Sequence, residues 1–214
     1  MKTLFNLLFV FFLLPISACQ TSWFTELATA QGERLFWDDF SDTSGNWPEY
    51  SQDDGSMGTV DGAYRILVTN TRYQLWAVSG QAFGDVQVEV DIFRHAGPQE
   101  NFSGLICRYQ DESNFYFFII SSDGYYTLGK VQEGQFALIG QEMMAFTSYI
   151  QQGEVINHLR FDCIGSTLTG FINDQMVAIT EDANFQEGDT GLTAGSFDQG
   201  GVEIRFDDFV VIKP

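Results

Sequence analysis

Two carboxylates stand at alternate positions in the run Glu89-Val90-Asp91. On a β-strand such side chains share a face, and retaining glycoside hydrolysis uses two carboxyl groups about 5–5.5 Å apart. The chain continues with Phe93 and Arg94, where the second Glu of a Glu-x-Asp-x-(x)-Glu pattern belongs. Because no acid/base residue follows, we interpret Glu89 and Asp91 as part of a polar sheet face and expect no retaining glycosidase activity from them.

The other residue types that perform catalysis do not form a recognisable set. His95 lies in a loop-like stretch and His158 opens a predicted strand. Neither lies beside a nucleophile motif, and the histidines and cysteines do not have the spacing of zinc ligands. We interpret both histidines as ordinary loop and strand residues.

Carbohydrate recognition is the chemistry that the aromatic and arginine residues suit best. Strand alternation places four candidate ligand-binding residues on one concave face: Arg65, Trp76, Arg108 and Tyr116. Aromatic rings pack against sugar faces, and guanidinium groups donate paired hydrogen bonds. The alternative, that these aromatic residues fill the core or brace a sheet, is equally consistent with the pattern.

The elements that must carry these residues are strands. Apolar and polar residues alternate over residues 86–93, 158–163, 167–172 and 202–207, and turn residues separate the runs. Period two with one apolar face is typical of half-buried strands. The alternation slips by one residue at Asp207-Asp208, which predicts a β-bulge. We therefore expect an all-β fold, an antiparallel β-sandwich, over residues 34–214.

The N-terminal residues have the pattern of an export signal. Lys2 precedes an apolar run over residues 4–16, too short for a membrane-spanning helix but suited to a signal peptide. Ile16-Ser17-Ala18-Cys19 resembles the bacterial lipobox. This resemblance implies a lipoprotein signal peptide at 1–18, a lipidated Cys19 with a tether to residue 33, and attachment to a membrane at the bacterial cell envelope. An ordinary secretory signal and a retained anchor helix are the alternatives.

The net charge limits the kinds of ligand that the protein can bind. With 10 Lys+Arg and 29 Asp+Glu the net charge is −19, which excludes a general nucleic-acid binder and favours neutral over acidic glycans.

In an oxidising compartment, Cys107 and Cys163 are disulfide candidates, since both lie in the inward phase of their strands. Such a bond would stabilise the fold by about 4 kcal/mol. Two buried free thiols are the alternative.

Several motifs over residues 35–212 resemble the concanavalin A-like lectin/glucanase superfamily, with LamG-like and 3-keto-disaccharide hydrolase-like domains as the nearest branches. They are the CRYQD and NFYF segments at 107–111 and 114–117, the SDGYY turn at 122–126, and FDDF at 206–209. The resemblance implies a jelly-roll sandwich. It also implies a structural calcium ion where the first and last strands meet, with Asp39 and Asp207 as ligands. The alternative is that these strand-end carboxylates only accept hydrogen bonds.

Three functions remain open at this point. The first is a lipid-anchored, non-catalytic module that binds carbohydrate or recognises a surface. The second, implied by the resemblance alone, is a glycoside or 3-keto-disaccharide hydrolase. The third is an envelope protein that binds another protein. We expect the first, because the acid/base pattern at Glu89 and Asp91 is incomplete.

Overall fold

The computed structural model describes residues 32–42, 45 and 47–214, which belong to one compact unit. The predicted signal peptide 1–18, Cys19 and most of the predicted tether lie outside the described residues. Within the described ranges, no helix is long and apolar enough to cross a bilayer. The strands are β1 (Arg34–Asp38), β2 (Tyr50–Gln52), β3 (Gly55–Val60), β4 (Ala63–Val68), β5 (Gln74–Phe83), β6 (Val86–Ala96), β7 (Asn101–Asp111), β8 (Asn114–Ile120), β9 (Tyr125–Gln132), β10 (Gln135–Leu138), β11 (Ala145–Phe146), β12 (Ile156–Ile164), β13 (Thr167–Ile172), β14 (Gln175–Glu181), β15 (Gly188–Ser196) and β16 (Val202–Ile212).

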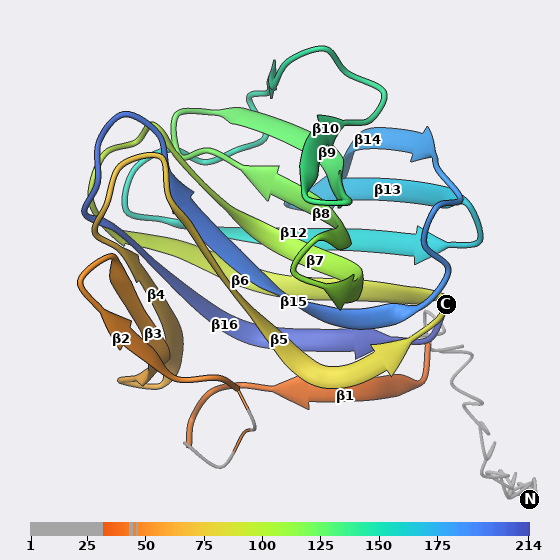
Figure 1. Ribbon diagram of the computed structural model, residues 1–214, viewed down its shortest axis with the longest axis horizontal. Helices are drawn as coiled ribbons and strands as arrows, with labels where there is room; N and C mark the ends of the chain where they lie inside the picture. Colours follow the sequence, from red (N-terminus) through yellow and green to blue (C-terminus); the bar gives the residue numbers. More distant parts are fainter. Residues whose placement is uncertain (1–31, 43–44, 46) are drawn as a thin grey trace, which may run out of the picture. The chain divides into compact units, whose positions relative to one another are not determined.

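The strands form two antiparallel sheets packed face to face (Figure 1). The nine-stranded sheet, sheet A, has the order β14-β13-β12-β6-β16-β4-β3-β2, with β1 also paired to β16. The seven-stranded sheet, sheet B, has the order β10-β9-β8-β7-β15-β5, with β11 paired to β9. The predicted all-β antiparallel sandwich is confirmed, and its architecture is a jelly roll.

The main core lies between the two sheets and follows the predicted alternation. In β6, Val88, Val90 and Ile92 are buried, and the polar residues between them face outward. The same apolar cluster includes Leu105 of β7 and Leu192 of β15 in sheet B. Period-two patterning therefore determines which side of each sheet faces the core and which side is free for a ligand.

The predicted β-bulge in β16 is present. The register of β16 against β6 shifts between Asp207 and Val210, and Asp208 has a φ angle of 50°. Both aspartates are exposed, and the bulge turns Phe209 back into the core. The extra residue thus preserves the apolar phase of the last strand and leaves two carboxylates on the outer surface of sheet A.

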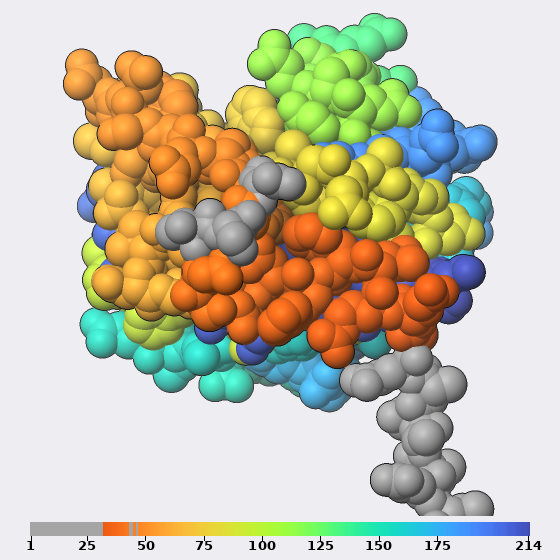
Figure 2. Space-filling model, turned by 90° about the horizontal axis from the view of Figure 1, so that it is seen from below, coloured from red at the N-terminus to blue at the C-terminus, as the bar shows by residue number. Residues whose placement is uncertain are grey.

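Strands β1 and β5 lie side by side at one edge of the sandwich (Figure 2). Trp47 packs behind β1, with its ring centroid 5.0 Å from that of Phe209 and 5.4 Å from that of Phe40. Asp38 accepts hydrogen bonds from the indole Nε1 of Trp47 at 3.0 Å and from the backbone N of Phe40 at 2.8 Å. One aspartate of the Asp38-Asp39 pair is therefore committed to holding this edge.

The predicted disulfide between Cys107 and Cys163 is confirmed. It joins β7 of sheet B to β12 of sheet A across 56 residues of sequence, and both cysteines are buried. The bond therefore links the two sheets through the buried core.

Candidate functional site

The outer face of sheet B carries a group of aromatic side chains, which we call the aromatic face. Its members come from β5, β7, β8 and β10: Trp76, Phe102, Tyr109, Phe115, Phe117 and Phe136. Neighbouring rings are in contact, with centroids 5.6 Å apart for Tyr109 and Phe115 and 4.7 Å apart for the stacked pair Phe117 and Phe136. The rings therefore meet in small groups. Phe115 and Phe117 are buried, and the partly or fully exposed rings are those of Trp76, Phe102, Tyr109 and Phe136.

A small second core supports the aromatic face. Ile106, Phe115, Phe117 and Ile119 are buried against one another on this side of the sheet. The ring of Phe102 lies directly on Gly195, where any Cβ atom would collide with it. Because these supports are packed, the partly exposed rings above them are held in place, which lowers the entropy cost of binding a ligand.

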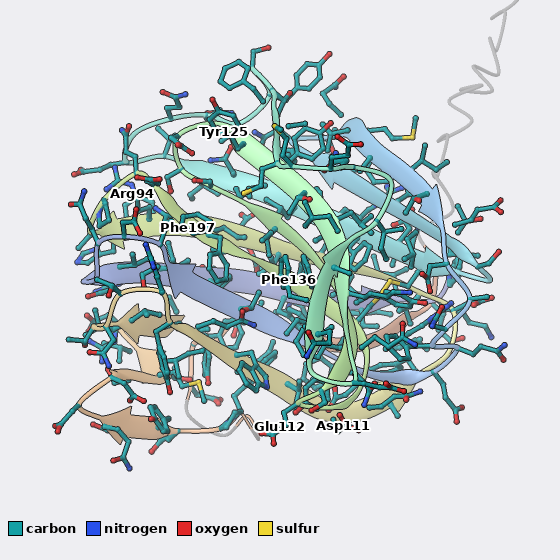
Figure 3. The ribbon with its side chains drawn as sticks, turned by 45° about the horizontal axis from the view of Figure 1, so that its top comes forward. Arg94, Asp111, Glu112, Tyr125, Phe136 and Phe197 are labelled. Atoms are coloured by element: carbon teal, nitrogen blue, oxygen red, sulfur yellow. A yellow bond between two sulfur atoms is a disulfide. The ribbon has the colours of Figure 1, made fainter. Side chains whose placement is uncertain are left out.

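A pocket of 660 Å³ lies at one end of this face, over the turn that leads into β9. Its lining combines aromatic, thioether and charged side chains: Arg72, Glu100, Ser121, Asp123, Tyr125, Met143, Met144, Phe197 and Asp198. Tyr125 and Phe197 are at this end in Figure 3, and Asp111 and Glu112 mark the opposite end. The centroid of Phe197 is 5.4 Å from that of Phe102, so the pocket continues into the aromatic face.

Hydrogen bonds between two loops position one wall of the pocket. The backbone N of Arg72 donates to the carbonyl of Phe197 at 2.7 Å. The hydroxyl of Ser196 donates to the carbonyl of Asn70 at 2.6 Å. The guanidinium of Arg72 then donates two hydrogen bonds to Asp198, at 3.0 and 2.8 Å. Ring, cation and carboxylate are therefore mutually fixed in this exposed wall.

The opposite wall is built on the turn before β9. Ser121 and Tyr125 close the turn by a backbone hydrogen bond of 2.7 Å, and the hydroxyl of Ser121 donates to Asp123. The ring of Tyr125 packs edge-on against Phe146, with centroids 5.6 Å apart. The ring of Tyr125 therefore lies next to fixed hydrogen-bonding groups, an arrangement that suits a ligand with apolar faces and hydroxyl groups at its edges.

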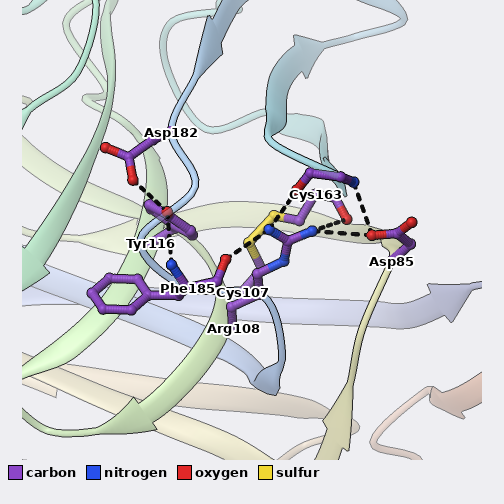
Figure 4. The surroundings of a disulfide bond; sticks show 8 residues. Asp85, Cys107, Arg108, Tyr116, Cys163, Asp182 and Phe185 are labelled. Atoms are coloured by element: carbon purple, nitrogen blue, oxygen red, sulfur yellow. Dashed lines mark hydrogen bonds and ion pairs between the residues drawn. A yellow bond between two sulfur atoms is a disulfide. The ribbon is translucent and has the colours of Figure 1, made fainter.

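Arg108 does not face this site, which corrects its assignment as a ligand-binding residue. Its side chain is 1 % exposed, because the positive φ of 52° at Arg108 and the register shift in β7 turn it into the interior. It donates to the carbonyls of Gly165, Phe185 and Cys163 at 2.7, 2.8 and 3.1 Å and pairs with Asp85 at 3.1 Å (Figure 4). All of these partners belong to the protein itself.

Tyr116 is also an interior residue, not a member of an exposed face. It is fully buried, its hydroxyl donates to Asp182 at 2.5 Å, and it accepts from the backbone N of Phe185 at 3.1 Å (Figure 4). Burial, followed by the hydrogen bond to Asp182, raises the pKa of Tyr116 to about 12. Lys130 pairs with the other oxygen of Asp182, which completes a structural network.

The remaining two predicted residues lie on opposite sheets. Trp76 is on the aromatic face, half-buried, with its Nε1 3.4 Å from the hydroxyl of Tyr109. Arg65 is on the outer face of sheet A, where it donates to Ser56 at 2.8 Å. The predicted single face of four residues is therefore not formed, and of these residues Trp76 alone lies on the aromatic face.

Glu89 and Asp91 lie on the outer face of sheet A, away from the aromatic face. Asp91 bonds the Nδ1 of His158 at 2.8 Å, and Glu89 lies 3.8 Å from its Nε2. The hydrogen bond that His158 donates to Asp91, opposed in part by burial, raises the pKa of His158. The charges of Asp91, Glu89 and Asp174 act in the same direction.

We expect Asp91→Asn to lower the pKa of His158 toward its ordinary value of about 6.5. Since the folded-state pKa is raised, the pair stabilises the native protein fully below the pKa of unfolded histidine. This contribution is lost as pH rises through the folded pKa. His158 is 38 % exposed, so the contribution to stability is small. An NMR titration of the two histidines in wild type and variant measures the shift, and an unchanged pKa would contradict the pairing.

The predicted calcium ligand Asp207 lies among several carboxylates, one of which is the second predicted ligand, Asp39. Burial, and then the carboxylates of Asp208, Asp91 and Asp39, raise the pKa of Asp207. In the part of the chain that the structure describes, no group of three or more His, Cys, Asp or Glu side chains is arranged to hold a metal ion. Calcium binding at this position remains a prediction.

Comparison with solved structures shows that other proteins have the same jelly-roll fold. No protein-family model matches the chain, and no curated protein sequence matches it significantly. Among solved structures, the carbohydrate-binding module CBM66 from Bacillus subtilis is similar with a TM-score of 0.56 and 18 % identity. That match covers 85 % of this chain and 98 % of the module.

Two further structures have the same architecture. A galectin-like protein of unknown function from Bacillus subtilis has a TM-score of 0.62 and 11 % identity, covering 85 % of this chain and 96 % of the other. The Bacillus licheniformis β-glucanase has a TM-score of 0.61 and 13 % identity, covering 84 % and 98 %. At these identities the likeness establishes the fold alone.

Sequence reasoning missed Arg72, Asp123, Tyr125 and Phe197. Tyr125 directly follows the Ser-Asp-Gly turn that the sequence displays, and an aromatic residue at such a position is a usable signal. Phe197 and Arg72 come together only because the β4–β5 and β15–β16 loops pair through their backbones. No local pattern in the sequence predicts that pairing.

Proposed function

We propose that this protein is a non-catalytic carbohydrate-binding module that holds a neutral oligosaccharide along the aromatic face. The observation that carries the proposal is the continuity of that face with the pocket at its end, where Tyr125 and Phe197 stand beside Arg72, Asp123 and Asp198. A sugar ring has apolar C–H faces and a hydroxyl rim. This surface offers rings for the faces and fixed donors and acceptors for the rim.

Charge supports a neutral ligand. Three carboxylates, those of Glu100, Asp123 and Asp198, line the pocket beside one guanidinium, which is already paired. Carboxylates accept hydrogen bonds from sugar hydroxyls but repel sulfate or uronate groups. The net charge of the whole chain, −19, adds to this repulsion at longer range.

The apolar floor of the aromatic face favours a binding role over hydrolysis. The centre of the aromatic face is floored by Ile106, Phe115, Phe117 and Ile119, which are apolar. The Glu89 and Asp91 carboxylates are on the other sheet and engage His158. A glycoside or 3-keto-disaccharide hydrolase remains the alternative, and product release from a sugar panel would reveal it.

The proposed location is the bacterial cell envelope, outside the cytoplasm, with lipid on Cys19 as the anchor.

Binding of an envelope protein is a second candidate function. Several large apolar side chains are exposed on the segment from β10 to β12, namely Phe136, Met143, Phe146, Tyr149 and Ile156. Pull-down of one partner from envelope extract without glycan dependence would favour that role.

We expect Trp76→Ala and Tyr125→Ala each to weaken glycan binding at least about tenfold, because each removes a ring that packs on the ligand. Ile179→Ala is the matched control, since Ile179 is exposed on β14 of sheet A. Calorimetric titration of the purified full chain with a neutral oligosaccharide that the wild type binds measures the effect. Wild-type affinity in both aromatic variants, with folding intact, would contradict the proposed site.

A further inference from the structure

A second groove, of 550 Å³, crosses the outer face of sheet A. It spans β12, β6, β16 and β1, and its lining includes Arg34, Trp37, Glu89, Asp91, His158 and Asp208. Val210 and Ile212 of β16 also line it. The groove therefore has an apolar part with polar groups beside it, the composition of a small ligand site.

Trp37 forms one wall and is held there by the fold. It pairs with Val210 in the β1–β16 ladder, and the next residue, Asp38, is fixed by its hydrogen bonds to Phe40 and Trp47. The indole remains 46 % exposed, and the guanidinium of Arg34 lies 5.6 Å from the ring centroid. A large aromatic surface with an adjacent planar donor is thus presented to solvent from a fixed strand.

His158 forms the polar wall opposite. Its Nδ1 is bonded to Asp91 at 2.8 Å, its Nε2 lies 3.8 Å from Glu89, and its backbone N donates to the side chain of Asn173 at 2.9 Å. The imidazole is therefore oriented from several sides, yet its side chain stays 38 % exposed. Asp91 also lines the neighbouring pocket with Phe93 and Arg205, so the polar wall extends along β6.

We propose that this groove is a second carbohydrate-binding site, so that the chain carries two sites on the outer faces of opposite sheets. The inference rests on the proposed function. It assigns to the groove a neutral oligosaccharide whose ring packs on Trp37 and whose hydroxyls bond Arg34, Glu89, Asp91 and His158. Because the hydrophobic core separates the two faces, one sugar ring cannot contact both sites. A protein molecule with both sites therefore holds two glycan segments together.

The test is the stoichiometry of glycan binding to the purified full chain, measured by calorimetry with a short neutral oligosaccharide. We expect two sites in wild type, one in Trp37→Ala, one in Trp76→Ala and none in the double variant. His158→Ala is the second variant for the groove, and it should weaken one of the two sites at least about fivefold without removing the other. Thermal unfolding checks that each variant is folded.

The outcomes separate the two proposals. One site in wild type, unaffected by Trp37→Ala and His158→Ala but lost in Trp76→Ala, would overturn the second site and leave the proposed function intact. A single site lost in Trp37→Ala and kept in Trp76→Ala would support the groove and overturn the aromatic face as the binding surface. No binding by folded protein to any neutral oligosaccharide would overturn both.

Discussion

Replacing Arg108 with Met is expected to lower the free energy of unfolding by about 3–5 kcal/mol. The substitution leaves the carbonyls of Phe185 and Cys163 without their charged donor inside the protein, whereas water can replace the donor at exposed Gly165. Unsatisfied buried polar groups cost about 1–3 kcal/mol each. Asp85 contributes little to the loss, because its side chain is 53 % exposed and water can replace the guanidinium.

Urea unfolding followed by fluorescence measures this loss, and Arg72→Met is the matched control. Arg72 also makes an ion pair with an aspartate, but its side chain is 80 % exposed. We therefore expect the control to lose less than about 1 kcal/mol. Equal, small losses in both variants would contradict the structural role assigned to Arg108.

Removing the disulfide by Cys107→Ala with Cys163→Ala is expected to destabilise the fold by about 4 kcal/mol. The bond closes a loop of 56 residues, and its loss returns conformational entropy to the unfolded chain. A single Cys107→Ala variant should lose nearly as much, because the bond disappears in both cases. A double variant that unfolds at the wild-type urea concentration would show that the bond adds nothing to stability.

The two effects should not be additive. Arg108 follows Cys107 in β7 and donates to the carbonyl of Cys163, so the disulfide helps to place one of its acceptors. Residues that share a network show interaction energies of about 0.5–3 kcal/mol. A double-mutant cycle that combines Arg108→Met with the cysteine variants measures this coupling.

The sequence predicts the fold well where local patterning decides it. The alternation in residues 86–92 and 202–206 predicts strands and their inward faces, and the slip at Asp207-Asp208 predicts the bulge, all as observed. The inward phase of Cys107 and Cys163 predicts the disulfide. These features depend on period two and on chain chemistry, both of which are visible in the printed sequence.

The site is predicted less well, because alternation fails at irregular backbone. Strict alternation from Cys107 places Arg108 on the outside, but its positive φ and the register shift in β7 turn it inward. Tyr116 fails for a different reason: Phe115 and Phe117 point to the outer face of sheet B, so Tyr116 must point to the core. Both faces of β8 are apolar, so composition alone does not distinguish them.

The most direct test of carbohydrate binding is a screen of the purified full chain against a broad panel of neutral oligosaccharides, with each bound sugar analysed afterwards for cleavage. The predicted result is saturable binding of at least one neutral glycan that is recovered intact, with weaker binding after Trp76→Ala. Release of a shorter sugar would contradict the non-catalytic role. Failure of the folded chain to bind any member of the panel would contradict carbohydrate recognition itself.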